Sequence, residues 1–232
     1  MKRLFDFLVA LCALLVLSPF LFLISLLIYL QDFHSPYYIA PRVGRDGKLF
    51  RMVKFRSMVV NADRTGVTST SATDRRITPM GHFVRRWKLD ELVQLWNVML
   101  GHMSLVGPRP NVRSATDLYT PAERQLLSVQ PGITDFASIV FADEGDILRG
   151  HADADGAYDQ LIRPWKSRLG IFYVEHHTFL MDLKLIFLTV KAIASRTAAL
   201  RSVSAELQRH RAPEALVRVA LRTDELRPGT PP

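Results

Sequence analysis

The sequence predicts an α/β, mainly helical protein in which an N-terminal membrane helix precedes one compact basic domain. Three observations lead to this prediction. Residues 4–30 form an apolar run in which Asp6 is the one charged residue. Farther along, Asp46-Gly47 lies between two strand-like segments and is a strong signal for a short β-hairpin. Beyond the hairpin, apolar residues recur at helical spacing, and residues 179–196 show this pattern strongly.

Length and charge limit the number of domains and the kind of partner. With 232 residues, the chain has room for one substantial domain and an attachment. Its net charge of +8 at pH 7 predicts an anionic partner, such as nucleic acid, anionic lipid or a phosphorylated substrate. We find no nucleic-acid-binding motif. A single cysteine, Cys12, excludes an intrachain disulfide and a cysteine-based zinc site.

The apolar run is long enough to enter a bilayer. As a straight helix it would measure roughly 40 Å, against about 30 Å for the hydrocarbon core. We find no signal-peptide cleavage site, and Lys2-Arg3 form a flank typical of the cytoplasmic side. Ser18-Pro19 must kink or break the helix, and the serine hydroxyl can satisfy a freed carbonyl. The residues leave two arrangements open, a kinked spanning helix and a helix that re-enters one leaflet.

After the membrane segment, the sequence turns to short strands and loops. Tyr37 and Tyr38 suit the headgroup level. Residues 49–58 alternate in part, which places Lys54 and Arg56 on one side of a strand, where a solvated face is the simpler interpretation. A polar loop is expected over residues 61–73.

Two adjacent acids, Asp90 and Glu91, precede a run with helical periodicity. Its apolar residues, which share one predicted helix face, are Leu92, Leu95, Trp96 and Met99, and Gly101 marks the helix end. The acids therefore fall in the first turn, where the helix dipole favours negative charge. Neighbouring residues point about 100° apart around a helix, so the pair is not a proton-sharing dyad. The acids could share a metal ion, or one could bind metal while the other attacks; the simpler interpretation is helix capping.

Arg109 lies between Pro108 and Pro110, each of which fixes its own backbone φ. A rigidly held guanidinium suits phosphate or carboxylate oxygens, and a structural salt bridge is the alternative. Two weaker metal signals follow. Residues 153–156 resemble part of a calcium loop but lack its final glutamate, and His176-His177 have no third ligand in view.

The C-terminal third is helical and basic. Residues 179–196 predict either a buried core helix or one lying in the membrane interface. From residue 198 we expect a basic helix and then a Pro/Gly tail that is disordered.

The order of these motifs resembles the small bacterial phosphoglycosyl transferases, also called bacterial sugar transferases. The resemblance covers residues 2 to about 195. The matching segments are residues 2–6, Ser18-Pro19, 42–44, 47–50, 54–58, 76–78, 89–92, 94–98, 103–110 and 131–134.

The resemblance implies a membrane topology and a reaction. Residues 1–36 would form a re-entrant helix broken at Ser18-Pro19. Residues 37–197 would form a compact catalytic domain with interfacial amphipathic helices, on the cytoplasmic face of the bacterial inner membrane; residues 198–232 would follow as the basic helix and tail. The enzyme would transfer a sugar 1-phosphate from a UDP-sugar to a polyprenyl phosphate, such as undecaprenyl phosphate, and release UMP. Such a step begins a membrane-linked glycoconjugate or polysaccharide.

By the same resemblance, Asp90 is the nucleophile and Glu91 helps to hold Mg²⁺. The basic residues that would hold the diphosphate are Lys54, Arg56, Arg76 and Arg109. Mg²⁺ and several basic residues fit this reaction, because the charge of a diphosphate must be neutralised before an anionic carboxylate can attack it.

Three departures from the family pattern stand out. Val93 replaces a proline, His102 replaces an acid, and residues 132–138 lack the usual Gly-Trp-Ala-Gln continuation. Two other functions remain open: a membrane-anchored protein that binds nucleic acid or lipid without catalysis, and a metal-dependent phosphohydrolase that uses the same acids. The sequence leaves the sugar, the polymer and a homodimer open.

Overall fold

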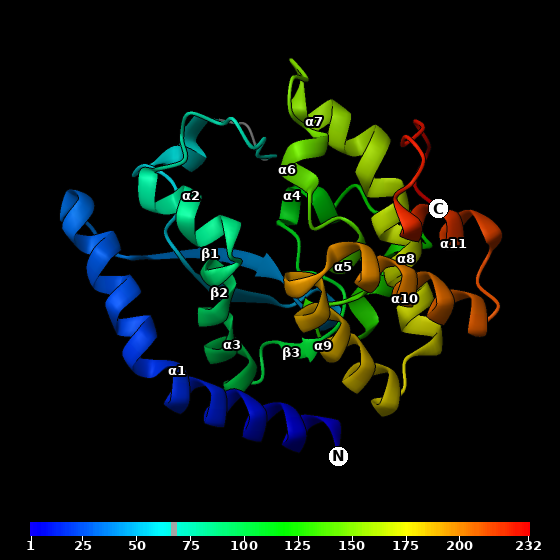
Figure 1. Cartoon of the computed structure of the whole chain (residues 1–232), viewed down its shortest axis with the longest axis horizontal. Coiled ribbons are helices and arrows are strands. Elements are labelled where there is room, and N and C mark those ends of the chain that lie inside the picture. Colours follow the sequence, from blue (N-terminus) through cyan, green and yellow to red (C-terminus); the bar gives the residue numbers. More distant parts are fainter. Residues whose placement is uncertain (66–68) are drawn as a thin grey trace.

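A long N-terminal helix, a β-hairpin and a set of shorter helices make up the protein (Figure 1). The computed structural model describes residues 1–65 and 69–232. The α-helices are α1 Lys2–Asp32, α2 Pro79–Arg86, α3 Leu95–Met99, α4 Arg113–Thr116, α5 Phe136–Val140, α6 Glu144–Ile147, α7 Ala154–Ala157, α8 Arg163–His176, α9 Phe179–Ala194, α10 Arg196–Arg209 and α11 Glu214–Leu221. The strands are β1 Tyr37–Val43, β2 Leu49–Phe55, β3 Ser104–Val106 and β4 Gly132–Thr134. Short 3₁₀ turns are η1 Arg45–Gly47, η2 Ala62–Thr65, η3 Leu89–Gln94 and η4 Glu123–Ser128, and η5 Tyr158–Ile162 is a π-helical turn.

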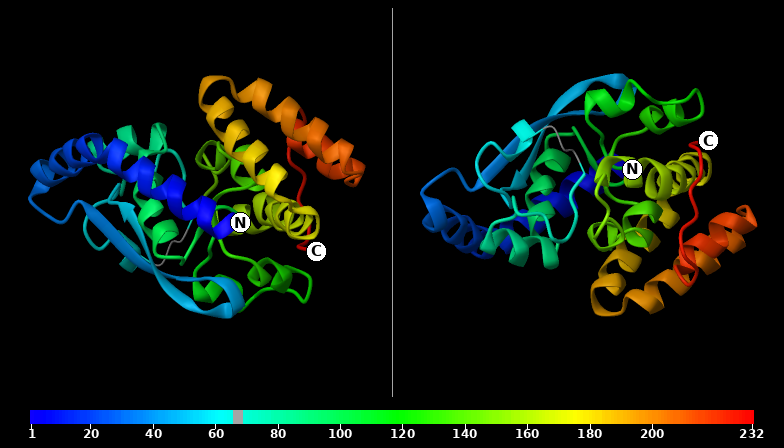
Figure 2. Two further views of the ribbon diagram at one scale, coloured as in Figure 1. Left: turned by 90° about the horizontal axis from the view of Figure 1, so that it is seen from below. Right: turned by 90° about the horizontal axis from the view of Figure 1, so that it is seen from above.

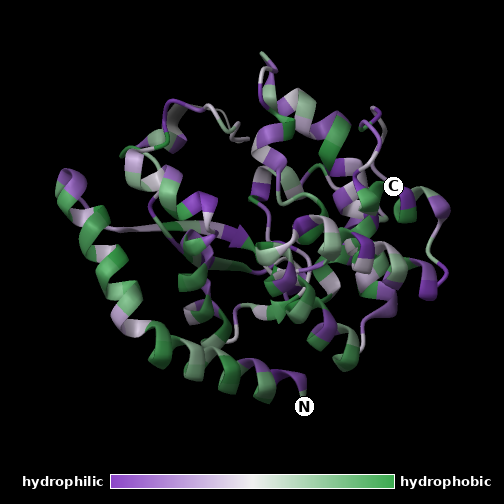
Figure 3. Cartoon of the chain, viewed as in Figure 1, coloured by the Kyte–Doolittle hydropathy of each residue, from purple (hydrophilic) through white to green (hydrophobic). Residues whose placement is uncertain are grey.

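Helix α1 is the one helix in the described chain that is long and apolar enough to cross a membrane. It is apolar along most of its length and bends sharply part-way along (Figure 3). Pro19 lies inside it, and Ser18 Oγ donates to the Leu15 carbonyl at 2.8 Å. Because that carbonyl is the one that Pro19 leaves without an amide partner, the hydroxyl lets the helix continue. The predicted break at Ser18-Pro19 is therefore wrong, and a kink takes its place.

The start of α1 is tied into the domain by buried polar contacts. Lys2 forms an ion pair with Asp182 of α9, and its Nζ also donates to the Val106 carbonyl at 3.1 Å. Asp6, which is 3% exposed, accepts a hydrogen bond of 2.8 Å from Ser104 Oγ on β3. Seen from below, α1 crosses one face of the molecule (Figure 2).

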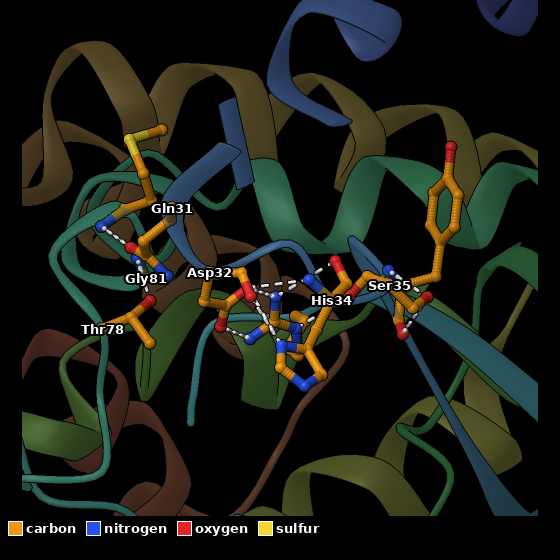
Figure 4. A network of polar contacts seen from close by, with 9 residues as sticks. Gln31, Asp32, His34, Ser35, Thr78 and Gly81 are labelled. Atoms are coloured by element: carbon orange, nitrogen blue, oxygen red, sulfur yellow. Dashed lines mark hydrogen bonds and ion pairs between the residues drawn. The ribbon is translucent and has the colours of Figure 1, made fainter. Parts of the chain in front are cut away.

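The end of α1 is tied to the same domain. Asp32 accepts two hydrogen bonds of 2.6 Å from Arg56, just beyond β2. Gln31 Oε1 accepts the Met80 amide of α2 at 3.1 Å, beside the Thr78 cap of that helix (Figure 4). Both ends of α1 are therefore held by one body of protein.

The predicted hairpin is confirmed. Strands β1 and β2 pair antiparallel from Tyr37 opposite Phe55 to Val43 opposite Leu49. Asp46 and Gly47 adopt the left-handed backbone region in the connecting turn, with φ of 56° and 73°. Aspartate and glycine tolerate this region better than other residues, which is why the pair marks the turn.

A short parallel pair, β3 and β4, runs through the domain core. Ser104 pairs with Gly132 and Val106 with Thr134. Where the chain leaves β3, Gly107 contacts Gly132 so closely that a Cβ on Gly132 would lie 2.1 Å from the Gly107 nitrogen. Helices α5 and α9 pack against this pair, and α8 and α10 pack on α5. Their fully buried side chains include Phe136, Leu169, Leu185 and Leu207.

The C-terminal segment belongs to the same core, contrary to the boundary expected at residue 198. Val203 and Leu207 of α10 and Ala220 of α11 are fully buried. The tail also packs on the domain instead of being disordered: the Gly229 amide donates to Gln160 O at 3.0 Å, and Arg168 Nη1 donates to Thr230 O at 2.9 Å. Apolar residues at helical spacing between the basic ones explain the packing of α10.

Candidate active site

The acid pair lies in η3, between α2 and α3. Lys88, in the left-handed region with φ of 55°, begins this 3₁₀ turn, and the α-helix proper starts at Leu95. The acids were expected in the first turn of one α-helix, so their position at a helical start is confirmed and the helix type is not. Trp96, one of the apolar residues of the predicted helix face, is 47% exposed.

Glu91 is held by two cations. Arg109 Nη1 donates to Oε2 at 2.8 Å, and Arg109 Nη2 donates to Oε1 at 2.5 Å. Lys54 Nζ lies 4.0 Å from Oε1. Burial alone would raise the pKa of Glu91, but Arg109 and Lys54 outweigh it and lower that pKa to about 2. Glu91 is therefore ionised at physiological pH.

Asp90 is in a different state. Within residues 1–65 and 69–232, no side chain donates a hydrogen bond to its carboxylate or forms an ion pair with it. Burial, followed by the charge of Glu91, raises the pKa of Asp90, while Lys54, Arg85 and Lys88 oppose the rise. The carboxylate is thus surrounded by cations but engaged by none of them, which leaves its oxygens available for attack on an electrophile.

Arg109 owes its position to the segment after β3. The close contact of Gly107 and Gly132 fixes where this segment leaves the core, and Nη1 of Arg109 also donates to Ile133 O at 3.2 Å. Two residues on, the Asn111 carbonyl accepts the Val43 amide of β1 at 2.9 Å. In this structure Arg109 forms the carboxylate pair that the sequence left as one of its two alternatives.

Of the four basic residues predicted to hold a diphosphate, the structure brings two to the acid pair, Lys54 and Arg109. Arg56 does not join them, because β2 ends at Phe55 and the Arg56 guanidinium pairs with Asp32 and donates to Ser35 O at 2.8 Å.

Arg76 is paired with a residue close to it in the sequence. Its Nη2 forms an ion pair of 2.7 Å with Asp74, and its Nη1 donates to Ala62 O at 3.2 Å. Arg56 and Arg76 therefore anchor loops in this structure, and their binding of the diphosphate stays a prediction.

Arg42 was not included in the predicted site. It lies on β1 on the hairpin face that also carries Lys54, since Tyr38, four residues before Arg42 and so on the same face, pairs directly with Lys54. The segment 42–44 was included in the motif match, but no site role was assigned to Arg42.

Comparison with known proteins shows to which family the chain belongs. The sequence model described as bacterial sugar transferase matches residues 1–196, most of the chain. The chain belongs to the bacterial sugar transferase family. As a bacterial sugar transferase it is a phosphoglycosyl transferase, which confirms the resemblance drawn from the motifs.

Named relatives agree with this assignment. This bacterial sugar transferase is 39% identical over 207 residues to an exopolysaccharide production protein, PSS, of Rhizobium leguminosarum bv. phaseoli, covering 84% of this chain and 96% of that protein. It is 37% identical to the undecaprenyl-phosphate glucose phosphotransferase of Komagataeibacter xylinus, covering 85% of this chain but 36% of that protein. It is 34% identical to the UDP-glucose:undecaprenyl-phosphate glucose-1-phosphate transferase of Escherichia coli K12, covering 82% of this chain and 39% of that enzyme.

The donor set of the site suits Mg²⁺. No group of three or more His, Cys, Asp or Glu side chains in the described part of the chain could hold a metal ion. Mg²⁺ usually takes one or two protein carboxylates, with water and phosphate oxygens completing its coordination. Asp90 and Glu91 provide that number, since each Glu91 oxygen has a second lone pair beyond the bond to Arg109. Asp153 instead caps α7 by accepting the Gly156 amide at 2.9 Å.

Proposed function

We propose that this chain transfers a sugar 1-phosphate from a UDP-sugar to undecaprenyl phosphate, releases UMP, and so begins a membrane-linked polysaccharide. The observation that carries the proposal is the contrast within the acid pair. Glu91 is neutralised by Arg109 and Lys54, whereas Asp90 has no partner in the described chain. The names of the relatives, which specify undecaprenyl phosphate as acceptor, support the substrate class.

In the first displacement, an Asp90 carboxylate oxygen attacks the phosphorus next to the sugar. A bond forms between that oxygen and phosphorus, and the bond from phosphorus to the bridging oxygen breaks, so UMP leaves with the bonding electrons. Lys54 and Arg109 neutralise charge on the phosphate oxygens that the anionic carboxylate must approach. Held by Glu91 and Asp90, Mg²⁺ would supply further shielding of the diphosphate charge.

In the second displacement, a phosphate oxygen of the polyprenyl carrier attacks the same phosphorus. The bond to Asp90 breaks, its carboxylate is regenerated, and the product is a polyprenyl diphosphate sugar. Covalent catalysis of this kind lets the nucleotide leave before the bulky lipid reacts. The raised pKa of Asp90 also fits the role, because a more basic carboxylate is the stronger nucleophile once ionised.

We infer that α1 is re-entrant. One domain holds both ends, through Lys2 with Asp182 and through Asp32 with Arg56. A bilayer that contains the apolar middle of α1 must therefore receive and return the chain on one face. Because UDP-sugars are cytosolic, that face is the cytoplasmic side of the inner membrane.

Helix α9 supports the same membrane orientation. Its core face carries Met181, Leu185 and Leu188, and its opposite face exposes large apolar side chains. These exposed residues are Leu180, Phe187, Val190 and Ile193, which are 75%, 65%, 62% and 62% exposed. Lys2 at the start of α1 joins this helix through Asp182. An apolar face beside the membrane helix fits an interfacial position.

The test of the proposed function is the stoichiometry of UMP release. With UDP-sugar and Mg²⁺ but no lipid, we expect one UMP per enzyme, and continuous turnover on addition of undecaprenyl phosphate. A phosphohydrolase would release UMP and free sugar phosphate continuously without lipid. A binding protein without catalysis would release none, and a DNA oligonucleotide would then raise its Tm as much as UDP-sugar with Mg²⁺ does.

A further inference from the structure

Arg42 is a half-buried cation without an acidic partner, and it lies beside the active site. Its Nη1 donates to the neighbouring Pro41 carbonyl at 2.9 Å, and no carboxylate in the described part of the chain forms an ion pair with it. A positive charge that is partly removed from water without a counter-charge is costly. Binding of an anion that is not part of the protein would remove this cost.

The hairpin register directs Arg42 toward the site. Tyr38 pairs with Lys54, and Ala40 and Arg42 follow on the same face because side chains alternate along a strand. Ala40, buried between them, is small. A long side chain at residue 42 can therefore extend over it toward Lys54.

The backbone brings Arg42 beside Arg109 as well. The amide of Val43, next to Arg42, donates to the carbonyl of Asn111 at 2.9 Å, and Asn111 is two residues beyond Arg109. The two guanidinium groups interact: burial lowers the pKa of Arg42, and the charge of Arg109 lowers it further, although Tyr38 opposes this. Like charges held together in this way indicate a site for an anion with more than one charge.

Arg42 adjoins the cations that flank the acid pair. The charges of Lys54, Arg85 and Lys88 act on Asp90, and Arg42 in turn acts on Lys54 and Arg109. The phosphate attacked by Asp90 must lie beside that carboxylate. The second phosphate of a diphosphate would then extend toward Arg42.

We propose that Arg42 binds the phosphate that remains with the nucleotide, so that it holds the leaving group of the first displacement. This inference rests on the proposed function, because it assumes a nucleoside diphosphate sugar as donor. Because attacking and leaving oxygens lie in line, the lipid phosphate enters at the place that the UMP phosphate has left, so Arg42 also faces the acceptor phosphate. Its removal should therefore slow both half-reactions and weaken UMP binding.

The test compares Arg42→Gln with Arg51→Gln. Arg51 is a suitable control because it is an exposed arginine on the opposite face of the same hairpin, with no side-chain partner in the described structure. The first half-reaction is measured as the burst of UMP in the absence of lipid. The second is measured as transfer from pre-formed phosphosugar enzyme, freed of nucleotide, to undecaprenyl phosphate. UMP affinity is measured separately by calorimetry.

We expect Arg42→Gln to slow the first half-reaction and weaken UMP binding, each by about 10- to 100-fold, the loss of one charge-assisted contact. The second half-reaction should slow by a similar factor, because the lipid phosphate takes the place that UMP leaves, and Arg51→Gln should match wild type in all three measurements. If Arg42→Gln does not fold, Arg42→Lys should show the same pattern with a smaller loss.

Slowing of both half-reactions with wild-type UMP affinity would show that Arg42 only supports the fold. Wild-type rates in both half-reactions would also overturn the inference. Failure of the proposed function looks different, because the wild-type enzyme would then give no single burst of UMP and no phosphosugar enzyme to transfer from.

Discussion

Replacing Arg109 by lysine tests the geometry of the site while keeping its charge. Arg109 makes two parallel hydrogen bonds to Glu91, at 2.8 and 2.5 Å, and a third of 3.2 Å to Ile133 O. A lysine has one nitrogen on a flexible stem, so it can keep one bond to Glu91 but not the fork. The change therefore removes at least one charge-assisted hydrogen bond.

The cost to stability should be modest. A hydrogen bond to a charged group contributes about 1.5–3 kcal/mol. The Arg109 side chain is 30% exposed and that of Glu91 18%, so solvent screening reduces the loss to about 1 kcal/mol. For a chain of this length that corresponds to a fall in Tm of about 2–4 °C. The pKa of Glu91 is lowered to about 2, so its contribution is complete above its ordinary value of 4.5 and is lost as pH falls toward 2.

The cost to activity should be larger, because Arg109 also neutralises charge on the phosphate in the proposed reaction. Loss of one charge-assisted contact in the transition state lowers kcat/KM by about 10- to 100-fold. The assay is UMP release at several donor concentrations, alongside a thermal melt. A cycle with Glu91→Gln then measures the coupling between the two side chains. Wild-type turnover in Arg109→Lys, together with a lowered Tm, would show that Arg109 is a scaffold residue and would refute its role in catalysis.

Two further predictions concern topology and pH. Single cysteines at residues 2 and 35, in a cysteine-free background, should both resist an impermeant reagent in intact cells. Pro19→Ala should shift residue 35 toward labelling from outside. Labelling of residue 35 without that substitution would establish a spanning helix. The UMP burst should fall at acidic pH as Asp90 is protonated. Since Lys54 lowers the pKa of Asp90, Lys54→Met should move this acidic limb to higher pH, and an unmoved limb would contradict the charge interaction.

Local signals in the sequence predicted a large part of the structure correctly. Asp46-Gly47 predicted the hairpin turn because these residues tolerate a left-handed backbone. The Ser18 hydroxyl was expected to hydrogen-bond to a carbonyl freed by Pro19, and it donates to the Leu15 carbonyl at 2.8 Å. That same bond keeps α1 continuous, which is why the predicted break became a kink.

Ion-pair partners were harder to predict, because they depend on how distant segments pack. Arg56 was assigned to the diphosphate, but its carboxylate partner, Asp32, lies 24 residues earlier at the end of α1. Strand periodicity alone could not show that β2 stops one residue before Arg56. Arg76 is different, because Asp74, two residues away, was visible as a local partner.

The central claim is that Asp90 carries the phosphosugar. The direct measurement mixes enzyme, Mg²⁺ and a UDP-sugar radiolabelled in the sugar, without lipid acceptor, then quenches the reaction and maps the labelled peptide. The account predicts label on the peptide that contains Asp90, chased off by undecaprenyl phosphate, and no label in Asp90→Asn. Normal transfer to lipid by Asp90→Asn, or label on a different residue, would contradict it.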